Sequence, residues 1–121
     1  MKNILVPTDF SANADKALDF ALALARRFNA TIHMVHTYHT SRQAGHLTNV
    51  NRHIRKDREA EMEAFLTKLR NNPAAESLQI EGRARYGFAV ETISNEASGV
   101  EADMIIMGTL GASNMAKNVL G

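Results

Sequence analysis

The stretch that decides the fold lies near the end of the printed chain and reads Asp103-Met104-Ile105-Ile106-Met107-Gly108-Thr109-Leu110-Gly111-Ala112-Ser113-Asn114. An apolar run suited to a buried strand leads directly into a glycine loop, and the loop leads toward a helix. Glycines let backbone N–H groups approach an anion closely, and the first turn of a helix adds unpaired N–H donors. Many strand-to-helix turns contain glycine for other reasons, so the rest of the chain must decide between a phosphate site and an ordinary turn.

Length and composition indicate one globular domain over residues 1–121. Apolar residues make up 45% of the sequence and charged residues 22%, a balance typical of folded rather than disordered proteins. The formal net charge of +1 gives no field that would favour nucleic acid as a partner. The chain has no cysteine, which excludes a disulfide framework and agrees with a reducing cytoplasm. No apolar run approaches the roughly 18 residues of a membrane span, so no membrane partner is expected.

The first part of the chain has the pattern of a strand, a helix and a second strand. Asn3-Ile4-Leu5-Val6 is an unbroken apolar run stopped by Pro7, as in a strand buried on both faces of a parallel sheet. Ser11 is a good N-cap for a helix that extends to residue 28. Residues 31–38 are β-branched and apolar and predict a second strand, parallel to the first. The apolar residues of this helix recur at helical spacing and are Ala14, Ala17, Leu18, Ala21, Leu22, Ala25 and Phe28.

The second part predicts two further helices and a strand between them. Residues 40–51 are polar and weakly patterned, which indicates a loop before a charged helix over residues 52–71. Residues 78–86 alternate between apolar and polar, as in an edge strand with one face in water. Gly87 then turns the chain into a short helix over residues 88–97. The apolar positions of the two helices are Ile54, Met62, Phe65, Leu66 and Leu69, and then Phe88, Val90, Ile93 and Ala97.

Strands alternating with helices predict an α/β fold, an open parallel sheet with helices on both faces. In such sheets ligands bind beyond the carboxyl ends of the strands. The loop at residues 7–11 follows the first strand, and the loop at residues 108–114 follows the strand at residues 103–107. If those two strands are neighbours, the two loops face each other across one crevice.

Several motifs resemble the universal stress protein family. They are Val6-Pro7-Thr8-Asp9-Phe10-Ser11, His36, Tyr86-Gly87 and the run from Ala102 to Gly108. The most specific match is the pattern of the nucleotide-binding branch, in which two residues separate the first two glycines and nine separate the second from the third. Gly108, Gly111 and Gly121 have this spacing. The resemblance covers essentially the whole chain in register.

This resemblance implies a Rossmann-like, adenine nucleotide α-hydrolase-like fold. It also implies a regulatory module of a cytoplasmic stress response that binds ATP, with Mg²⁺ on the phosphates and no metal held by the protein alone. The implied partner is a second copy in a homodimer, or a second universal stress protein domain. The first loop would hold adenine and ribose, Thr37 and Met107 would border the base, and the glycine motif would approach the ribose and phosphates. The residues placed at the nucleotide are Pro7, Thr8, Asp9, Thr37, Met107, Gly108, Gly111, Ser113, Asn114 and Gly121.

The sequence departs from the family pattern at two places. Leu110 stands where many relatives have a polar or charged residue. The printed chain ends at Gly121, one residue before the serine or threonine of the pattern, and we expect the last strand and helix of the fold to be missing. The sequence would then be a fragment, such as the first half of a tandem-domain protein. An uncovered apolar sheet edge would favour association.

The same residues also have structural explanations. Asp9 suits a turn or an N-cap before a helix, and glycines suit turns. His33, His36 and His39 are three residues apart, but side chains alternate along a strand, so His33 and His36 should point to opposite faces. We therefore expect histidines that form hydrogen bonds rather than a metal site.

The sequence contains no recognisable pairing of a nucleophile with a base, so no strong catalytic activity is expected and any ATP hydrolysis would be slow. Two functions remain open. One is an ATP-binding regulatory module, and the other is a dimerising interaction domain with an unoccupied nucleotide pocket. An enzyme of a related adenine-nucleotide superfamily is a remote third.

Overall fold

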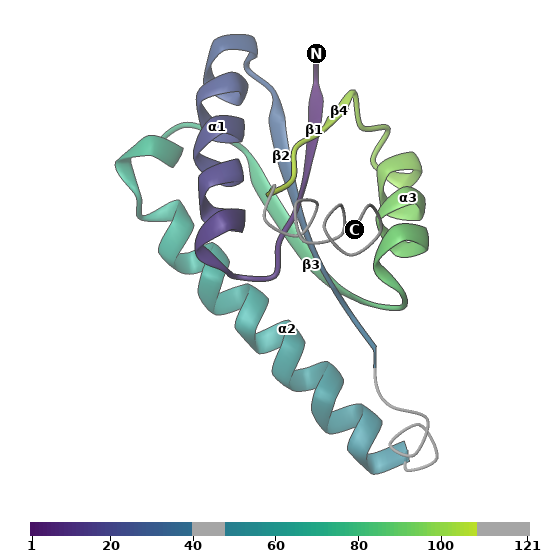
Figure 1. The fold of residues 1–121 in the computed structure, drawn as a ribbon. Helices are drawn as coiled ribbons and strands as arrows, with labels where there is room; N and C mark the ends of the chain where they lie inside the picture. The colour runs from purple at the N-terminus through teal and green to yellow at the C-terminus, as the bar shows by residue number, and fades with distance from the viewer. Residues whose placement is uncertain (40–47, 109–121) are drawn as a thin grey trace, which may run out of the picture.

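The computed structural model describes residues 1–39 and 48–108 of the chain. The described strands pair in the order β3-β2-β1-β4, and every pair is parallel. Helices α1 and α2 cover one face of this sheet, and α3 lies on the other (Figure 1). The predicted α/β architecture, with helices on both faces of an open parallel sheet, is confirmed. In chain order the elements are β1 (Asn3–Pro7), α1 (Ala12–Phe28), β2 (Thr31–Tyr38), α2 (Thr48–Arg70), the 3-10 turn η2 (Pro73–Ala75), β3 (Ile80–Tyr86), α3 (Ala89–Gly99) and β4 (Met104–Ile105).

The apolar core lies between the sheet and the two helices α1 and α2. Alternate residues of the central strands, such as Ile4 in β1 and Met34 in β2, are fully buried in it. Gly82 of β3 lets α2 approach directly, because a Cβ at this position would lie 2.8 Å from the Met62 sulfur and 3.0 Å from Leu66 Cδ1. The predicted apolar face of α2 is therefore the face that packs on the sheet.

Helix α1 begins where the sequence predicts. The Ser11 hydroxyl accepts a hydrogen bond from the Ala14 N–H at 3.2 Å and caps the first turn. The helix ends at Asn29, which adopts a left-handed conformation with φ of 54°. The apolar positions from Ala14 to Ala25 are buried, but Phe28 is 47% exposed, so its predicted burial is wrong. Phe28 lies in the last turn, beyond the buried face of the helix.

Helix α2 begins at Thr48, four residues before the predicted start at Arg52, so the predicted loop over residues 40–51 is too long. The early turns extend past the sheet (Figure 1), where no apolar face is needed. Within the predicted range, charge pairs follow: Arg58 and Glu61 are 2.7 Å apart, and the side chain of Arg55 reaches to 3.9 Å from Glu59. The first turn was missed because residues 48–51 contain a single apolar residue, Val50, and so show no apolar periodicity.

Helix α3 packs on the sheet through a charged residue that the sequence did not single out. Glu96 is only 9% exposed, and its carboxylate accepts hydrogen bonds from Arg83 Nη1 at 3.1 Å and Arg85 Nε at 3.0 Å, both on β3. The expected apolar positions Phe88 and Val90 are 69% and 82% exposed and face away from the sheet. The periodicity located the helix correctly, but the arginines of β3 determine which side it buries.

Strand β4 covers only Met104–Ile105 of the predicted residues 103–107, and Asp103, just before it, binds the start of the chain instead. The Asp103 carboxylate accepts the backbone N–H groups of Lys2 at 2.7 Å and Asn3 at 2.9 Å. These backbone hydrogen bonds lower the pKa of Asp103.

Among the described residues, no helix combines the length and apolar character needed to cross a membrane.

Candidate functional site

A cleft of about 350 Å³ opens at the carboxyl ends of the strands, between the loop after β1 and the end of β4. Strands β1 and β4 are neighbours, with Ile4 opposite Met104 and Leu5 opposite Ile105. The loop after β1 and Gly108 after β4 therefore lie at the same edge of the sheet, while the rest of the predicted glycine loop lies outside the described residues. The volume lies within the range of small-ligand sites, roughly 300–1,000 Å³.

The structure brings together every predicted site residue that it describes. The cleft is lined by Pro7, Thr8, Asp9, Thr37, Met107 and Gly108. These residues come from the ends of β1, β2 and β4, which are far apart in the sequence but adjacent in the sheet. The remaining predicted residues, Gly111, Ser113, Asn114 and Gly121, lie outside the described residues.

The turn after β1 is shaped by hydrogen bonds between its own side chains and backbone. Thr8 Oγ1 accepts the N–H of Phe10 at 2.9 Å, and Asp9 Oδ1 accepts the N–H of Ser11 at 2.9 Å. Phe10 has a φ of 64°, which is a left-handed conformation that costs a bulky residue about 1–3 kcal/mol. The turn lifts the Asp9 side chain out of the sheet and leaves it exposed at the edge of the cleft.

Asp9 carries a stable negative charge. Hydrogen bonds from the Ser11 side chain and backbone lower the pKa of Asp9 and outweigh the opposing effect of partial burial. Its carboxylate can accept hydrogen bonds from hydroxyl or amino groups, whereas it repels a phosphate. Both explanations offered by the sequence therefore hold together, because the same side chain shapes the turn and borders the cleft.

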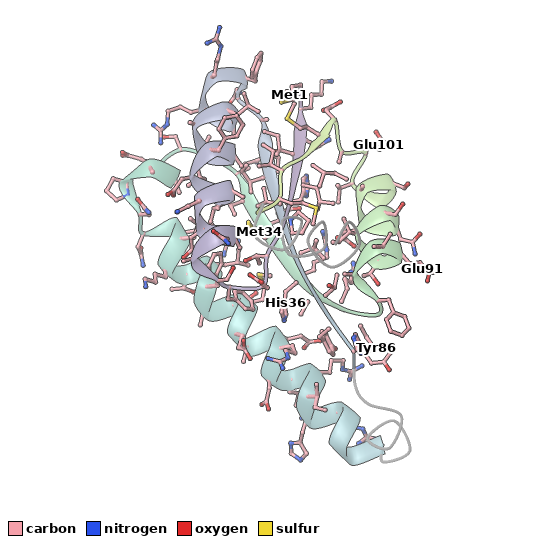
Figure 2. The ribbon with its side chains drawn as sticks, viewed as in Figure 1. Met1, Met34, His36, Tyr86, Glu91 and Glu101 are labelled. Carbon is pink, nitrogen blue, oxygen red and sulfur yellow. The ribbon has the colours of Figure 1, made fainter. Side chains whose placement is uncertain are left out.

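The two histidines of β2 lie on opposite faces of the sheet, as predicted. His36 Nδ1 is 2.9 Å from the Thr8 carbonyl oxygen, on the face that carries α1 and α2 (Figure 2). His33 Nε2 is 2.9 Å from Asn3 Oδ1, and burial lowers the pKa of His33. In the described part of the chain, no three His, Cys, Asp or Glu side chains are grouped closely enough to hold a metal ion.

The close approach of Gly108 to the backbone of Asn13 favours glycine at this position, independently of any turn. A Cβ at this position would lie 3.1 Å from both the carbonyl carbon and the oxygen of Asn13. That distance is tighter than ordinary van der Waals contact. The end of β4 therefore packs directly against the first turn of α1, which draws the two sides of the cleft together.

Sequence reasoning missed half of the cleft lining. Ser11, Asn13 and Ala14 come from the start of α1, Val35 from β2, and Ala89 and Ile93 from α3. Ser11 was recognised only as a helix cap. Ala89 and Ile93 carry no chemical signal in the sequence, since they border the cleft only because α3 lies across the end of β2.

The model of the Universal stress protein family matches residues 1–121. The crystal structure of a universal stress protein in complex with cAMP is 27% identical, with a TM-score of 0.72, and the match covers 99% of this chain and 84% of the other. UspA from Lactobacillus plantarum is 26% identical with a TM-score of 0.63, covering 88% of this chain and 75% of the other.

A universal stress protein from Archaeoglobus fulgidus shares the fold, with 22% identity and a TM-score of 0.70. That match covers 99% of this chain and 37% of the other. The comparison with curated proteins finds no match.

Proposed function

This chain belongs to the universal stress protein family, and from that premise we propose that it is a stress-response module that binds an adenine nucleotide in the cleft between β1 and β4. The observation that carries the proposal is the meeting of Asp9 with Met107 and Gly108 around one cavity of ligand size. The cAMP complex of a protein 27% identical over nearly the whole chain supports a nucleotide as the class of ligand.

The chemistry of the cleft supports the following proposal for which part of the nucleotide each residue contacts. The Asp9 carboxylate accepts hydrogen bonds from ribose hydroxyls or an amino group of the base. Met107, 51% exposed at the end of β4, offers a polarisable surface to a base, with Thr37 nearby on β2. Backbone N–H groups of the glycine motif that starts at Gly108 take the phosphates. We propose ATP with Mg²⁺ on its phosphates as the ligand in the cytoplasm, held with at most slow hydrolysis.

Isothermal titration calorimetry with ATP, adenosine and cAMP tests this proposal. Asp9→Asn removes the charge but keeps an oxygen for the Ser11 N–H, so the turn should persist. We expect ATP and adenosine to bind about ten- to hundredfold more weakly, the loss expected for one hydrogen bond to a charged group.

Asp103→Asn is the matched control, because Asp103 also accepts two backbone N–H groups but lies outside the cleft. It should leave nucleotide affinity unchanged. A loss confined to ATP in the Asp9 variant would contradict the contact with ribose or base. No binding of any of the three compounds to the wild-type chain at millimolar concentration would contradict the proposed function.

A second candidate function is a dimerising interaction domain. It is favoured by β4, which lies at the end of the described strand order and whose residues Met104 and Ile105 are 38% and 43% exposed. An apolar edge strand offers unpaired backbone groups to a second copy or to another domain of the same family. This candidate and nucleotide binding are compatible, since the edge of β4 and the cleft are different surfaces.

A further inference from the structure

A histidine of β2, His36, contacts the turn that carries Asp9. It lies on one face of the sheet, whereas α3, which forms a wall of the cleft, lies on the other face. His36 Nδ1 is 2.9 Å from the Thr8 carbonyl oxygen. A carbonyl oxygen can only accept, so Nδ1 carries the proton and donates it. Thr8 itself is 7% exposed, and its N–H is already bound to the Val35 carbonyl at 2.8 Å. The His36 bond therefore ties the carbonyl of the peptide between Thr8 and Asp9 to β2, beside the hydrogen bonds within the turn itself.

The partly buried His36 ring packs beside two aromatic rings and also borders a second cleft that includes Asp9, Arg58 and Glu61. Its ring centroid lies 4.6 Å from that of Phe10 and 6.4 Å from that of Tyr38. Its second nitrogen, Nε2, is buried and has no hydrogen-bond partner among the described residues. An orphaned buried nitrogen is unfavourable, so packing alone does not explain why this position carries a histidine.

The same ring also supports the strained residue of the turn. Phe10 has its left-handed φ of 64° directly after Asp9, and its side chain packs between His36 and Phe65, with a centroid distance of 5.3 Å to Phe65. A strained backbone persists only where its surroundings determine it from several sides. His36 contributes twice, through the Thr8 carbonyl and through the Phe10 ring.

We infer that His36 is a positioning residue, which holds the Thr8–Phe10 turn so that the Asp9 carboxylate faces the cleft before a ligand arrives. This inference rests on the proposed function for its consequence in nucleotide binding. The geometry that it asserts can be measured without any nucleotide. Preorganisation of this kind improves affinity because the contact need not be ordered during binding.

The test compares His36→Leu with His36→Asn. Leucine removes the donor, whereas the amide nitrogen of asparagine occupies nearly the position of Nδ1 and can donate to the Thr8 carbonyl without carrying a charge. His33→Leu is the matched control, because His33 lies on the same strand, is buried and forms its own bond to Asn3, but does not touch the turn. Should His36→Leu fail to fold, His36→Phe keeps a ring beside Phe10 and also lacks the donor.

The first readout is the pKa of Asp9, measured by NMR titration of its side-chain carboxyl carbon without nucleotide. Hydrogen bonds from Ser11 are the main cause of this low pKa and require the intact turn, whereas the charge of His36 lowers the pKa to a smaller extent and is lost equally in His36→Leu and His36→Asn. We expect it to rise toward its ordinary value in His36→Leu, and to remain low in His36→Asn and His33→Leu. A pKa that stays low in folded His36→Leu, or rises equally in His36→Asn, overturns the inference.

The second readout is calorimetric affinity for ATP. We expect about tenfold weaker binding for His36→Leu, with recovery in His36→Asn and no change in His33→Leu. Equal weakening by the two leucine variants would indicate general destabilisation and overturn the positioning role. If the wild-type chain binds no nucleotide, the proposed function fails, and the Asp9 titration still decides whether His36 holds the turn.

Discussion

At the scale of single residues, three positions have conformations or contacts that constrain which side chain they can carry. Phe10 adopts a left-handed conformation, Gly87 has a φ of 146°, and Gly108 leaves no room for a Cβ beside α1. All three follow the carboxyl ends of strands, and Gly108 lines the cleft itself. Backbone geometry therefore helps to shape this end of the sheet.

Gly87→Ala should destabilise the protein by about 1–3 kcal/mol. An alanine there would have to adopt an unfavourable φ, and its Cβ would lie 2.3 Å from Thr92 Oγ1. The free energy of unfolding from urea denaturation measures the effect. Combining it with Thr92→Ala should recover part of the loss, because that change removes the clash and leaves the strained φ.

Gly99→Ala is the matched control for this prediction. Gly99 is the last residue of α3, and a Cβ there would meet no atom within 4 Å. Alanine should be neutral or stabilising by up to about 1 kcal/mol, since it reduces the conformational entropy of the unfolded chain. Equal losses at Gly87 and Gly99 would contradict a specific role for the turn.

At the scale of elements, the two faces of the sheet are attached to their helices by different interactions. Helices α1 and α2 pack through a continuous apolar cluster. Helix α3 packs through Glu96, whose carboxylate bridges Arg83 and Arg85, with Ile93 and Ala97 half-buried beside it. The position of α3 therefore depends on one buried carboxylate.

Glu96→Gln should lower the free energy of unfolding by about 1–2 kcal/mol. Hydrogen bonds between charged groups are worth roughly 1.5–3 kcal/mol, and water screens part of that here because the arginine side chains are 38% and 50% exposed. Thermal and urea unfolding measure the change. Glu91→Gln, at an exposed position on the same helix, is the control and should change stability by less than about 0.5 kcal/mol. Similar effects of the two substitutions would contradict the bridging role.

At the scale of the whole molecule, the exposed residues of β4 are the basis of the proposed association with a second copy. If this edge pairs with a second copy, light scattering coupled to size-exclusion chromatography should show a dimer. Ile105→Lys should then convert it to a monomer, because a charge at an edge strand opposes pairing. Val90→Lys is the control, since Val90 is even more exposed but lies on α3. A wild-type chain that is monomeric at every concentration would contradict association.

The sequence predicted the architecture and roughly half of the cleft, for identifiable physical reasons. Buried strands such as 3–6 are marked by their apolar runs, and the alternation in β3 correctly marked an edge strand. Asp9 and Gly108 were found because they sit where strands end, in motifs with a family resemblance. Ala89 and Ile93 were missed because their role depends on how α3 crosses β2, which is a tertiary contact that neither residue type reveals.

The polar attachment of α3 has a consequence for how the molecule fluctuates. Salt screens the partly exposed charge pairs between α3 and β3 but does not weaken apolar burial under α1 and α2. Local opening of α3 should therefore require less free energy than global unfolding, and amide hydrogens of α3 should exchange with solvent earlier than those of α1. Since Ala89 and Ile93 form one wall of the cleft, we expect this wall to open more readily than the wall built on the sheet, and a bound ligand to stabilise it. A higher ionic strength would then make it easier for a ligand to enter the cleft.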